Sequence, residues 1–474
     1  MTSDMILNDE QSSLFRGRER RALRSYRPQR GQKGSAAAAP EELKGTFEAS
    51  RQKTLPWPVL LFLVAIIVPW IITLGDIRLS SYRIVLIATL IPSLVKWASG
   101  KAGPIRATDL ALLMYSVWSV VSLFTVHGWS AGLQPSAILF IETTSAYFLA
   151  RSYIRCLDDF YNMTRFLFWM VVLVLPFAIV EAFSGQNVFL KLFSMVLPST
   201  PYMPAEPRWG LRRVQAFAEH PILFGVCVGS FFSLVHLVLG YGRSVIRRFA
   251  MSGVIAVATF LSLSAGPMGA LAVQGLLITW DRMFRNYKWR WRIILGAVFV
   301  INLAIAAIPN ESLIMFYIKH LTFDEFTAYF RVLIWQYASQ SALNHPFFGV
   351  GLGEWERPYW MPESIDMFWL IHAVRYGIPA ALLMLLAFTL AFFSVSSKKD
   401  LNDRLSACRA AYLLCMAGFF LAGWAVHYWS ASYVLFLFLL GSGLWLLEVE
   451  TSSSGEEGGL QHRRRRGSGK MLQG

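Results

Sequence analysis

Long apolar runs, repeated along most of the chain, limit the folds that this sequence can adopt. A membrane-spanning helix needs roughly 20 mostly apolar residues to cross about 30 Å of hydrocarbon, and stretches of this kind follow one another between residues 55 and 450. The runs are continuously apolar and lack the alternation of lipid-facing strands, which favours helices over a β-barrel. Only 15% of the 474 residues are charged, which is low for a soluble chain of this length. The sequence therefore predicts an all-α integral membrane protein.

Hydropathy divides the membrane domain, residues 55–450, into about twelve predicted transmembrane helices. One region is ambiguous, because 249–280 fits either two short spans around Ala265-Gly266-Pro267 or one long broken helix. The predicted ranges are 55–74, 82–97, 109–126, 135–151, 166–183, 221–241, 249–264, 267–280, 293–309, 367–395, 408–426 and 430–447.

Lys and Arg are distributed unevenly between the predicted loops. Each loop that should be cytoplasmic carries several, whereas the short loops on the other side carry almost none, as the positive-inside rule requires. Merging 249–280 into one span would place Arg282 and Arg292 outside, so the rule favours two spans. Both termini are then cytoplasmic, and we expect residues 1–54 and 451–474 to be disordered basic tails. The net charge of +15 follows from this arrangement and does not indicate nucleic-acid binding.

Two long external loops, 184–220 and 310–366, break this pattern. Positive residues on the outer side oppose the insertion bias, and ligand binding is the explanation that we favour. The charged residues of interest are Arg212 and Arg213 in the first loop, and Arg331, Glu354, Arg357 and Asp366 in the second.

The second loop contains an Arg-Trp pair followed by a turn rich in Gly. Arg331 and Trp335 belong to a predicted helix that begins at Arg331 and is ended by Pro346. Glycines then recur at every second position and allow a tight backbone turn. This GxGxG run does not follow a strand, so it is not a nucleotide fingerprint. The turn residues are Pro346, Gly349, Gly351 and Gly353.

The 331–380 segment resembles the signature of the O-antigen ligase/polymerase superfamily, which comprises Wzy-type polysaccharide polymerases and lipid A-core O-antigen ligases. That signature pairs an Arg and a Trp with a downstream Pro-Φ-Φ-Gly-Φ-Gly turn and a later Gly step, here Tyr376-Gly377. The segment from Arg212 to Pro221 similarly resembles the family's Arg-containing first external loop. Two positions depart from the pattern: Ala265 stands where Arg is common, and Asp366 stands where ligases usually carry a His. The second departure points to the exopolysaccharide polymerase branch.

The resemblance implies a GT-C-like fold in a bacterial inner membrane and a metal-independent glycosyl transfer without a cofactor. The substrates would be glycans on undecaprenyl diphosphate, and a flippase and a chain-length regulator of the same pathway would be partners. Arg331, with Arg212 or Arg213, would stabilise the leaving diphosphate, and Asp366 would accept the proton of the acceptor hydroxyl. Trp335, Glu354 and Arg357 would contact the glycan.

Other interpretations of the same residues stay open. Asp366 is also well placed to cap the helix that follows it, and Arg331 could be an interfacial residue that extends toward water. The chain could instead be a ligase, or a permease, which would place its ionisable residues in mid-membrane. Glu142 is the main residue of that kind, and it either pairs with a polar neighbour or lines a cavity for the lipid-linked substrate.

Overall fold

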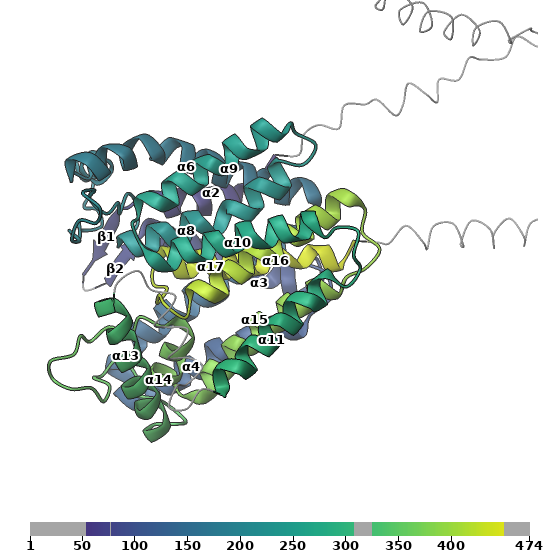
Figure 1. Cartoon of the computed structure of the whole chain (residues 1–474). Coiled ribbons are helices and arrows are strands. Elements are labelled where there is room, and N and C mark those ends of the chain that lie inside the picture. The colour runs from purple at the N-terminus through teal and green to yellow at the C-terminus, as the bar shows by residue number, and fades with distance from the viewer. Residues whose placement is uncertain (1–53, 76, 308–324, 450–474) are drawn as a thin grey trace, which may run out of the picture. The chain divides into compact units, whose positions relative to one another are not determined.

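The computed structural model describes residues 54–75, 77–307 and 325–449 (Figure 1). The predicted tails, apart from Thr54, and the first part of the 310–366 loop lie outside these residues. The described part is helical except for one antiparallel hairpin, in which β1 (Ile71–Leu74) pairs with β2 (Ile77–Ser80), with Ile71 opposite Ser80. The helices are α2 (Trp57–Ile67), α3 (Ser81–Ala98), α4 (Ala107–Phe140), η3 (Ile141–Ser145), α5 (Ala146–Tyr153), α6 (Leu157–Ser184), α7 (Val188–Ser194), α8 (Pro221–Leu234), η4 (Val235–Leu239), α9 (Val245–Leu261), α10 (Ala265–Met283), α11 (Arg290–Ala306), α13 (Glu325–Asn344), α14 (Phe368–Tyr376), α15 (Ile378–Ser397), α16 (Asp403–Ala422), α17 (Ala431–Ser442) and η5 (Leu444–Leu447).

Seven helical segments in the described part are long and apolar enough to cross a membrane. The chain is therefore an all-α membrane protein, as predicted, but the structure does not support the count of twelve spans. The seven segments are Ser81–Ala98, Ala107–Tyr153, Leu157–Ser184, Pro221–Leu239, Ile378–Ser397, Asp403–Ala422 and Ala431–Glu448.

The longest of these segments, Ala107–Tyr153, is a hairpin of two antiparallel arms. Its backbone leaves the helical conformation at Gly128, where φ is 73°, a value that glycine adopts without steric cost. The Thr144 hydroxyl lies 3.2 Å from the Ser116 hydroxyl, although a straight helix would separate these residues by about 42 Å. The two arms correspond to the predicted spans 109–126 and 135–151.

Four other predicted spans coincide with helices that do not meet the length and hydropathy of a span. The predicted span 55–74 ends early, because α2 has only 11 residues and Pro69 precedes the β-hairpin. The predicted spans 249–264, 267–280 and 293–309 correspond to α9, α10 and α11, of 17, 19 and 17 residues. Between α9 and α10 the chain reverses at Leu263, so the ambiguous region forms two helices.

The predicted span 367–395 was wrong, because it contains two helices rather than one. The backbone turns at Gly377, with φ 87° and ψ 163°, between α14 and α15. The rings of Trp369 and Phe388 lie 5.3 Å apart between their centroids, whereas a continuous helix would separate these residues by about 28 Å. The nine-residue α14 is therefore too short to cross a bilayer and folds back against α15.

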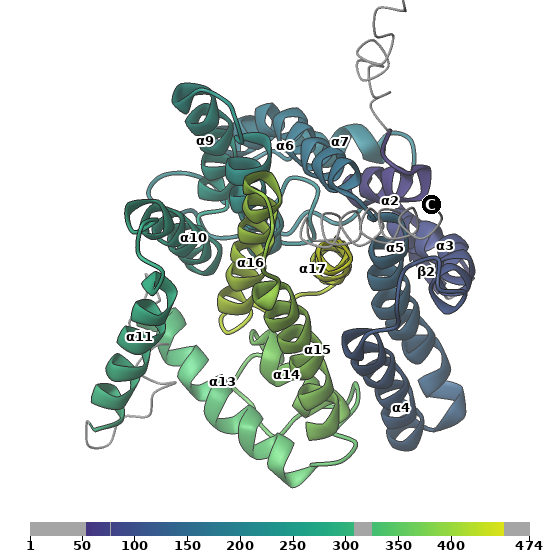
Figure 2. The same ribbon diagram turned by 90° about the vertical axis from the view of Figure 1, so that its right-hand side faces the viewer.

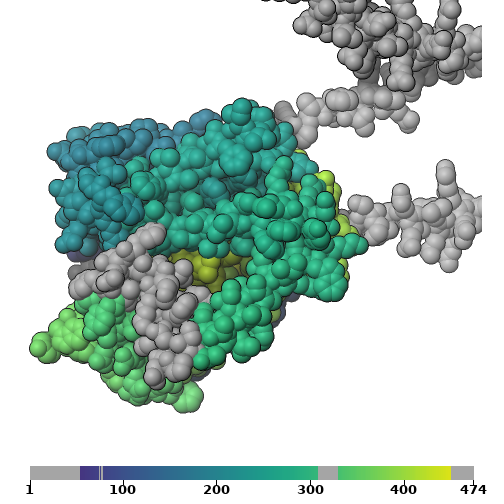
Figure 3. All heavy atoms as spheres, viewed as in Figure 1, coloured from purple at the N-terminus to yellow at the C-terminus, as the bar shows by residue number. Residues whose placement is uncertain are grey.

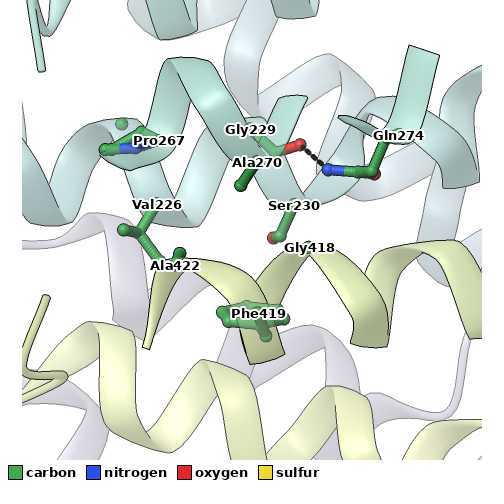
Figure 4. A pocket seen from close by; sticks show the side chains of 10 residues that line it. Val226, Gly229, Ser230, Pro267, Ala270, Gln274, Gly418, Phe419 and Ala422 are labelled. Atoms are coloured by element: carbon green, nitrogen blue, oxygen red, sulfur yellow. Dashed lines mark hydrogen bonds between the residues drawn. The ribbon is translucent and has the colours of Figure 1, made fainter. Parts of the chain in front are cut away.

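The interior of the bundle is built around α8 and α17. All residues of α17 are buried, and Figure 2 shows this helix end-on among its neighbours. Gly225 and Gly229 of α8 have the small-xxx-small spacing that lets membrane helices approach closely, and they face the turn between α9 and α10. Gln274 of α10 donates a hydrogen bond to the Gly229 carbonyl oxygen beside a small cavity of about 10 Å³ between α8, α10 and α16 (Figure 4). No predicted site residue lines this cavity.

Candidate functional site

Arg331 of α13 lies against the turn that joins α16 to α17. Its side chain is buried, and Nη2 donates a hydrogen bond to the Ala425 carbonyl oxygen at 3.1 Å. Burial lowers the pKa of Arg331, the nearby Asp366 raises it and Arg208 lowers it further. Because a guanidinium stays protonated even so, Arg331 brings a positive charge into a largely desolvated position.

Asp366 is the carboxylate that faces Arg331. Burial raises its pKa, and the positive charge of Arg331 opposes that rise. The residue does not cap the next helix, because α14 has Met367 at its N-cap and no side chain caps it. Instead, the backbone N–H of Phe368 donates to the Gly423 carbonyl oxygen at 2.8 Å. The capping interpretation was therefore wrong, and Asp366 and Arg331 both lie beside the α16–α17 turn.

Arg213 and Arg208 extend from the first long loop to the turn between α9 and α10. Arg213 Nη2 donates to the Ser264 hydroxyl at 2.9 Å, and Arg208 Nη1 donates to the Leu263 carbonyl oxygen at 3.0 Å. Burial, together with the charge of Arg208, lowers the pKa of Arg213 to about 10. The α9–α10 turn that these two arginines contact adjoins the α16–α17 turn that Arg331 contacts, because Gly266 packs against Ala425 and Val426. We call Arg208, Arg213, Arg331 and Asp366 the charged cluster.

Arg212 lies apart from this cluster. Its side chain is exposed and packs over Gly185, and its backbone N–H donates to the Ala182 carbonyl oxygen at 2.9 Å. Of the two arginines that the sequence left as alternatives, Arg213 is therefore the one near Arg331. Arg208 was not among the predicted site residues. Its position in the same external loop, as a positive residue that opposes the insertion bias, is the sequence feature that could have identified it.

Glu219 and His220 end the first loop beside the residues that lead into α17. His220 caps α8 through Nδ1, which accepts from the Ile222 N–H at 3.2 Å, and burial lowers its pKa to about 4. Glu219 Oε1 accepts from the Ala431 N–H at 3.5 Å, and burial raises the pKa of Glu219 to about 7. Sequence analysis did not single out Glu219, because nothing in its neighbours predicts this degree of burial.

Trp335 lies one helical turn after Arg331 on α13. Its ring centroid is 6.3 Å from that of Trp424, which directly precedes the Ala425 carbonyl that Arg331 contacts. Trp335 is thus part of the packing that holds α13 against the α16–α17 turn.

Arg357 and Glu354 form ion pairs within the second loop. Arg357 is only 9% exposed; its Nη2 lies 3.6 Å from Glu354 and 3.4 Å from Glu363, and its Nη1 donates to the Met361 carbonyl oxygen at 2.7 Å. These contacts give Arg357 a role in holding the loop, whereas the Glu354 carboxylate points to solvent.

The predicted glycine turn packs on the α14–α15 turn. Helix α13 begins at Glu325, earlier than predicted, and ends at Asn344, two residues before Pro346. Gly349 and Gly351 have positive φ values of 63° and 61°, whereas φ of Gly353 lies outside that region. The loop is tied down by hydrogen bonds from Val350 N–H to the Val374 oxygen, from Gly351 N–H to the Arg375 oxygen and from Ile378 N–H to the Pro346 oxygen, at 2.8, 2.9 and 2.8 Å.

Glu142 pairs with a polar neighbour inside the bundle. Its Oε1 lies 2.7 Å from Arg83 Nε and accepts from the Tyr82 hydroxyl at 3.2 Å. Among the described residues, no group of three or more His, Cys, Asp or Glu side chains could hold a metal ion.

Comparisons with known proteins do not assign the chain to a family. No protein-family model matches it, and no curated protein sequence matches it. The resemblance to the O-antigen ligase/polymerase superfamily, with the GT-C-like fold that it implies, therefore rests on the motif residues alone.

Proposed function

We propose that this protein is a membrane glycosyltransferase that polymerises undecaprenyl-diphosphate-linked oligosaccharide repeat units into a surface polysaccharide or exopolysaccharide. The reaction would take place at the periplasmic face of a bacterial inner membrane, with both termini in the cytoplasm. The observation that carries the proposal is the charged cluster at two adjoining turns of the bundle. Arg208 and Arg213 of the first long loop bind the α9–α10 turn, and Gly266 of that turn packs on Ala425, whose carbonyl oxygen accepts from Arg331 of the second loop. Arg331 is in turn within electrostatic reach of Asp366.

The chemistry of the cluster suits a lipid diphosphate. Arginine binds phosphate oxygens with two parallel hydrogen bonds and keeps its charge, and electrostatic attraction is stronger in a partly desolvated site. In the proposed step, an acceptor hydroxyl oxygen attacks the anomeric carbon of the donor, and the bond from that carbon to the phosphate oxygen breaks with inversion. The lipid diphosphate leaves with the electron pair and is held by Arg331 and Arg213. The hydroxyl proton passes to Asp366.

The position of ionisable residues favours this function over transport. A permease should hold its ionisable residues in mid-membrane, where they mark the path of the cargo. Here Glu142 is paired with Arg83, and the charged cluster lies in the loops and turns at one end of the bundle.

The test combines a deletion strain with variants of the cluster. Deletion should leave short lipid-linked repeats, whereas long unattached chains would identify a ligase. Complementation of the deletion strain with Arg331→Ala or Arg213→Ala should yield at least about 100-fold less polymer than complementation with the wild type. This is the loss expected when one charge contact to the transition state is removed. Arg212→Ala is the matched control and should retain polymer, because that side chain lies over Gly185.

Two variants of Asp366 test whether its carboxylate is the general base. Asp366→Asn keeps the shape but cannot accept a proton, so it should lose activity as fully as Asp366→Ala. Normal polymer with Asp366→Asn would show that another group is the base, and normal polymer with Arg331→Ala would overturn the assignment of the cluster.

A further inference from the structure

Four aromatic side chains lie together on the surface beside the charged cluster. Tyr359 is 96% exposed, Tyr329 57% and Trp360 50%. The Phe330 ring lies between two of them, with its centroid 6.1 Å from that of Tyr329 and 6.4 Å from that of Trp360, and Tyr359 directly precedes Trp360 in the chain. We call Tyr329, Phe330, Tyr359 and Trp360 the aromatic platform. In Figure 3 the segment that carries it, coloured light green, forms an outer part of the molecule.

The loop that presents Tyr359 and Trp360 is firmly anchored, so their exposure does not follow from a loosely packed segment. Trp355, Met361 and Ile365 of the same loop are buried in a small apolar core with α13 and α14. The Trp355 ring N–H donates to the Glu363 carbonyl oxygen at 2.9 Å, and Arg357 bridges Glu354 and Glu363. The loop thus buries Trp355, Met361 and Ile365 and holds Tyr359 and Trp360 in solvent.

The platform is continuous with the charged cluster along α13. Tyr329 and Phe330 directly precede Arg331, which turns inward to the Ala425 carbonyl while Tyr329 is exposed. Because Phe330 is next to Arg331 in the chain and its ring centroid lies 6.4 Å from that of Trp360, the platform begins beside Arg331.

We propose that the aromatic platform binds the glycan chain of the lipid-linked substrate, outside the reacting sugar. This inference rests on the proposed function. Aromatic faces offer flat apolar surface for the C–H faces of sugar rings, and a tyrosine hydroxyl adds a polar contact at little entropic cost. The Glu354 and Glu363 side chains, 79% and 81% exposed, belong to the same loop as Tyr359 and Trp360 and would accept hydrogen bonds from sugar hydroxyls.

A glycan fits this surface better than a bilayer does. Exposed aromatic residues also occur at membrane interfaces, but segments that lie on anionic membranes carry clusters of Lys and Arg. The exposed charges next to Tyr359 and Trp360 are carboxylates, which an anionic lipid surface repels. The consequence for the enzyme is a second hold on the glycan, which keeps a growing chain attached between successive transfers.

The double variant Tyr359→Ala/Trp360→Ala tests this role. It should still make polymer, since Arg331 and Asp366 are untouched, but the chains should be several-fold shorter. Tyr287→Ala/Trp289→Ala is the matched control, because these two exposed aromatics lie between α10 and α11. Polymer length is read on gels of the surface polysaccharide, with the deletion strain alongside.

Binding is measured on the full-length protein in lipid nanodiscs, with oligosaccharides cut from the host's own surface polysaccharide as the probe. The double variant should bind about tenfold more weakly than the wild type or the control. Unchanged affinity and chain length in the double variant would overturn the inference. Quenching of Trp360 fluorescence by brominated lipids would overturn it too, because it would place Trp360 in the bilayer; the Trp360 signal is obtained as the difference between the wild type and Trp360→Phe. If the deletion strain makes normal polysaccharide, the proposed function itself fails, which is a distinct result.

Discussion

Replacing Gly377 by alanine should separate the glycine turn of the second loop from the α14–α15 turn. Gly377 has φ 87° and ψ 163°, a conformation that costs an L-residue about 1–3 kcal/mol. A Cβ at this position would also overlap the carbonyl group of Phe347, which is backbone and cannot rotate away. The two segments must therefore move apart.

The movement breaks the contacts between the turns. Three backbone hydrogen bonds join them, and each contributes about 1 kcal/mol net. With the conformational strain, the expected loss of stability is about 4–6 kcal/mol. The broken bonds are Val350 N–H to Val374 O, Gly351 N–H to Arg375 O and Ile378 N–H to Pro346 O.

Thermal unfolding of the purified protein in detergent measures the loss, and amide hydrogen exchange locates it. Gly377→Ala should lower the melting temperature markedly and speed exchange at Val350, Gly351 and Ile378. The control is Gly296→Ala in α11, where a Cβ would meet nothing within 4 Å and φ is not positive. Equal melting temperatures for the two variants, with exchange unchanged at Val350, would refute the hairpin geometry at Gly377.

Two further predictions concern charges at the two ends of the bundle. Asp109→Asn should cost about 2–3 kcal/mol in thermal unfolding, because it removes one of the two carboxylates that pair with buried Arg151 and leaves Glu448 as the other. Asp281→Asn, at a partly exposed pair with Arg290, should cost about 1 kcal/mol or less. The pKa of Glu219 is about 7 in the folded protein, against an ordinary value of 4.5, so folding favours the protonated carboxyl. The stability that Glu219 contributes is therefore fully present below pH 4.5 and is lost as the pH rises through 7. Between pH 4.5 and 7, the free energy of unfolding should therefore fall by on the order of 2 kcal/mol more in the wild type than in Glu219→Gln. Parallel plots of this free energy against pH for the two proteins would contradict the prediction.

Hydropathy was sufficient to locate the helices but not their paths. Each predicted span contains helix, because apolar runs of this length must satisfy their backbone groups internally, although the predicted span 55–74 ends in strand β1. The reversal at Gly377 was missed, because the apolar pattern continues from α14 into α15 and hydropathy reports burial, not direction. The reversal at Gly128 was found, because polar residues interrupt the pattern there.

The same limit applies to the candidate site. Arg212 and Arg213 are neighbours with the same charge, and only the backbone path of the loop decides that Arg213 reaches Ser264 while Arg212 covers Gly185. Asp366 looked like a cap because it precedes a helix, but the carbonyl oxygens of the α16–α17 turn take that function for the first N–H of α14. Contacts between loops distant in sequence cannot be read from local pattern.

The two ends of the bundle differ in how their charges are balanced. At the end of α5, buried Arg151 lies 3.4 Å from Asp109 and 3.1 Å from Glu448, so structural carboxylates match its charge. At the other end, within the described residues, the three arginines of the charged cluster have Asp366 as the carboxylate that acts on Arg331. The first network is built from carboxylates of the bundle itself, whereas Arg208 and Arg213 of the charged cluster donate to a carbonyl and a hydroxyl oxygen. Phosphate oxygens accept from guanidinium groups more strongly than such neutral oxygens do, and for this reason we place the diphosphate of the proposed substrate at this end.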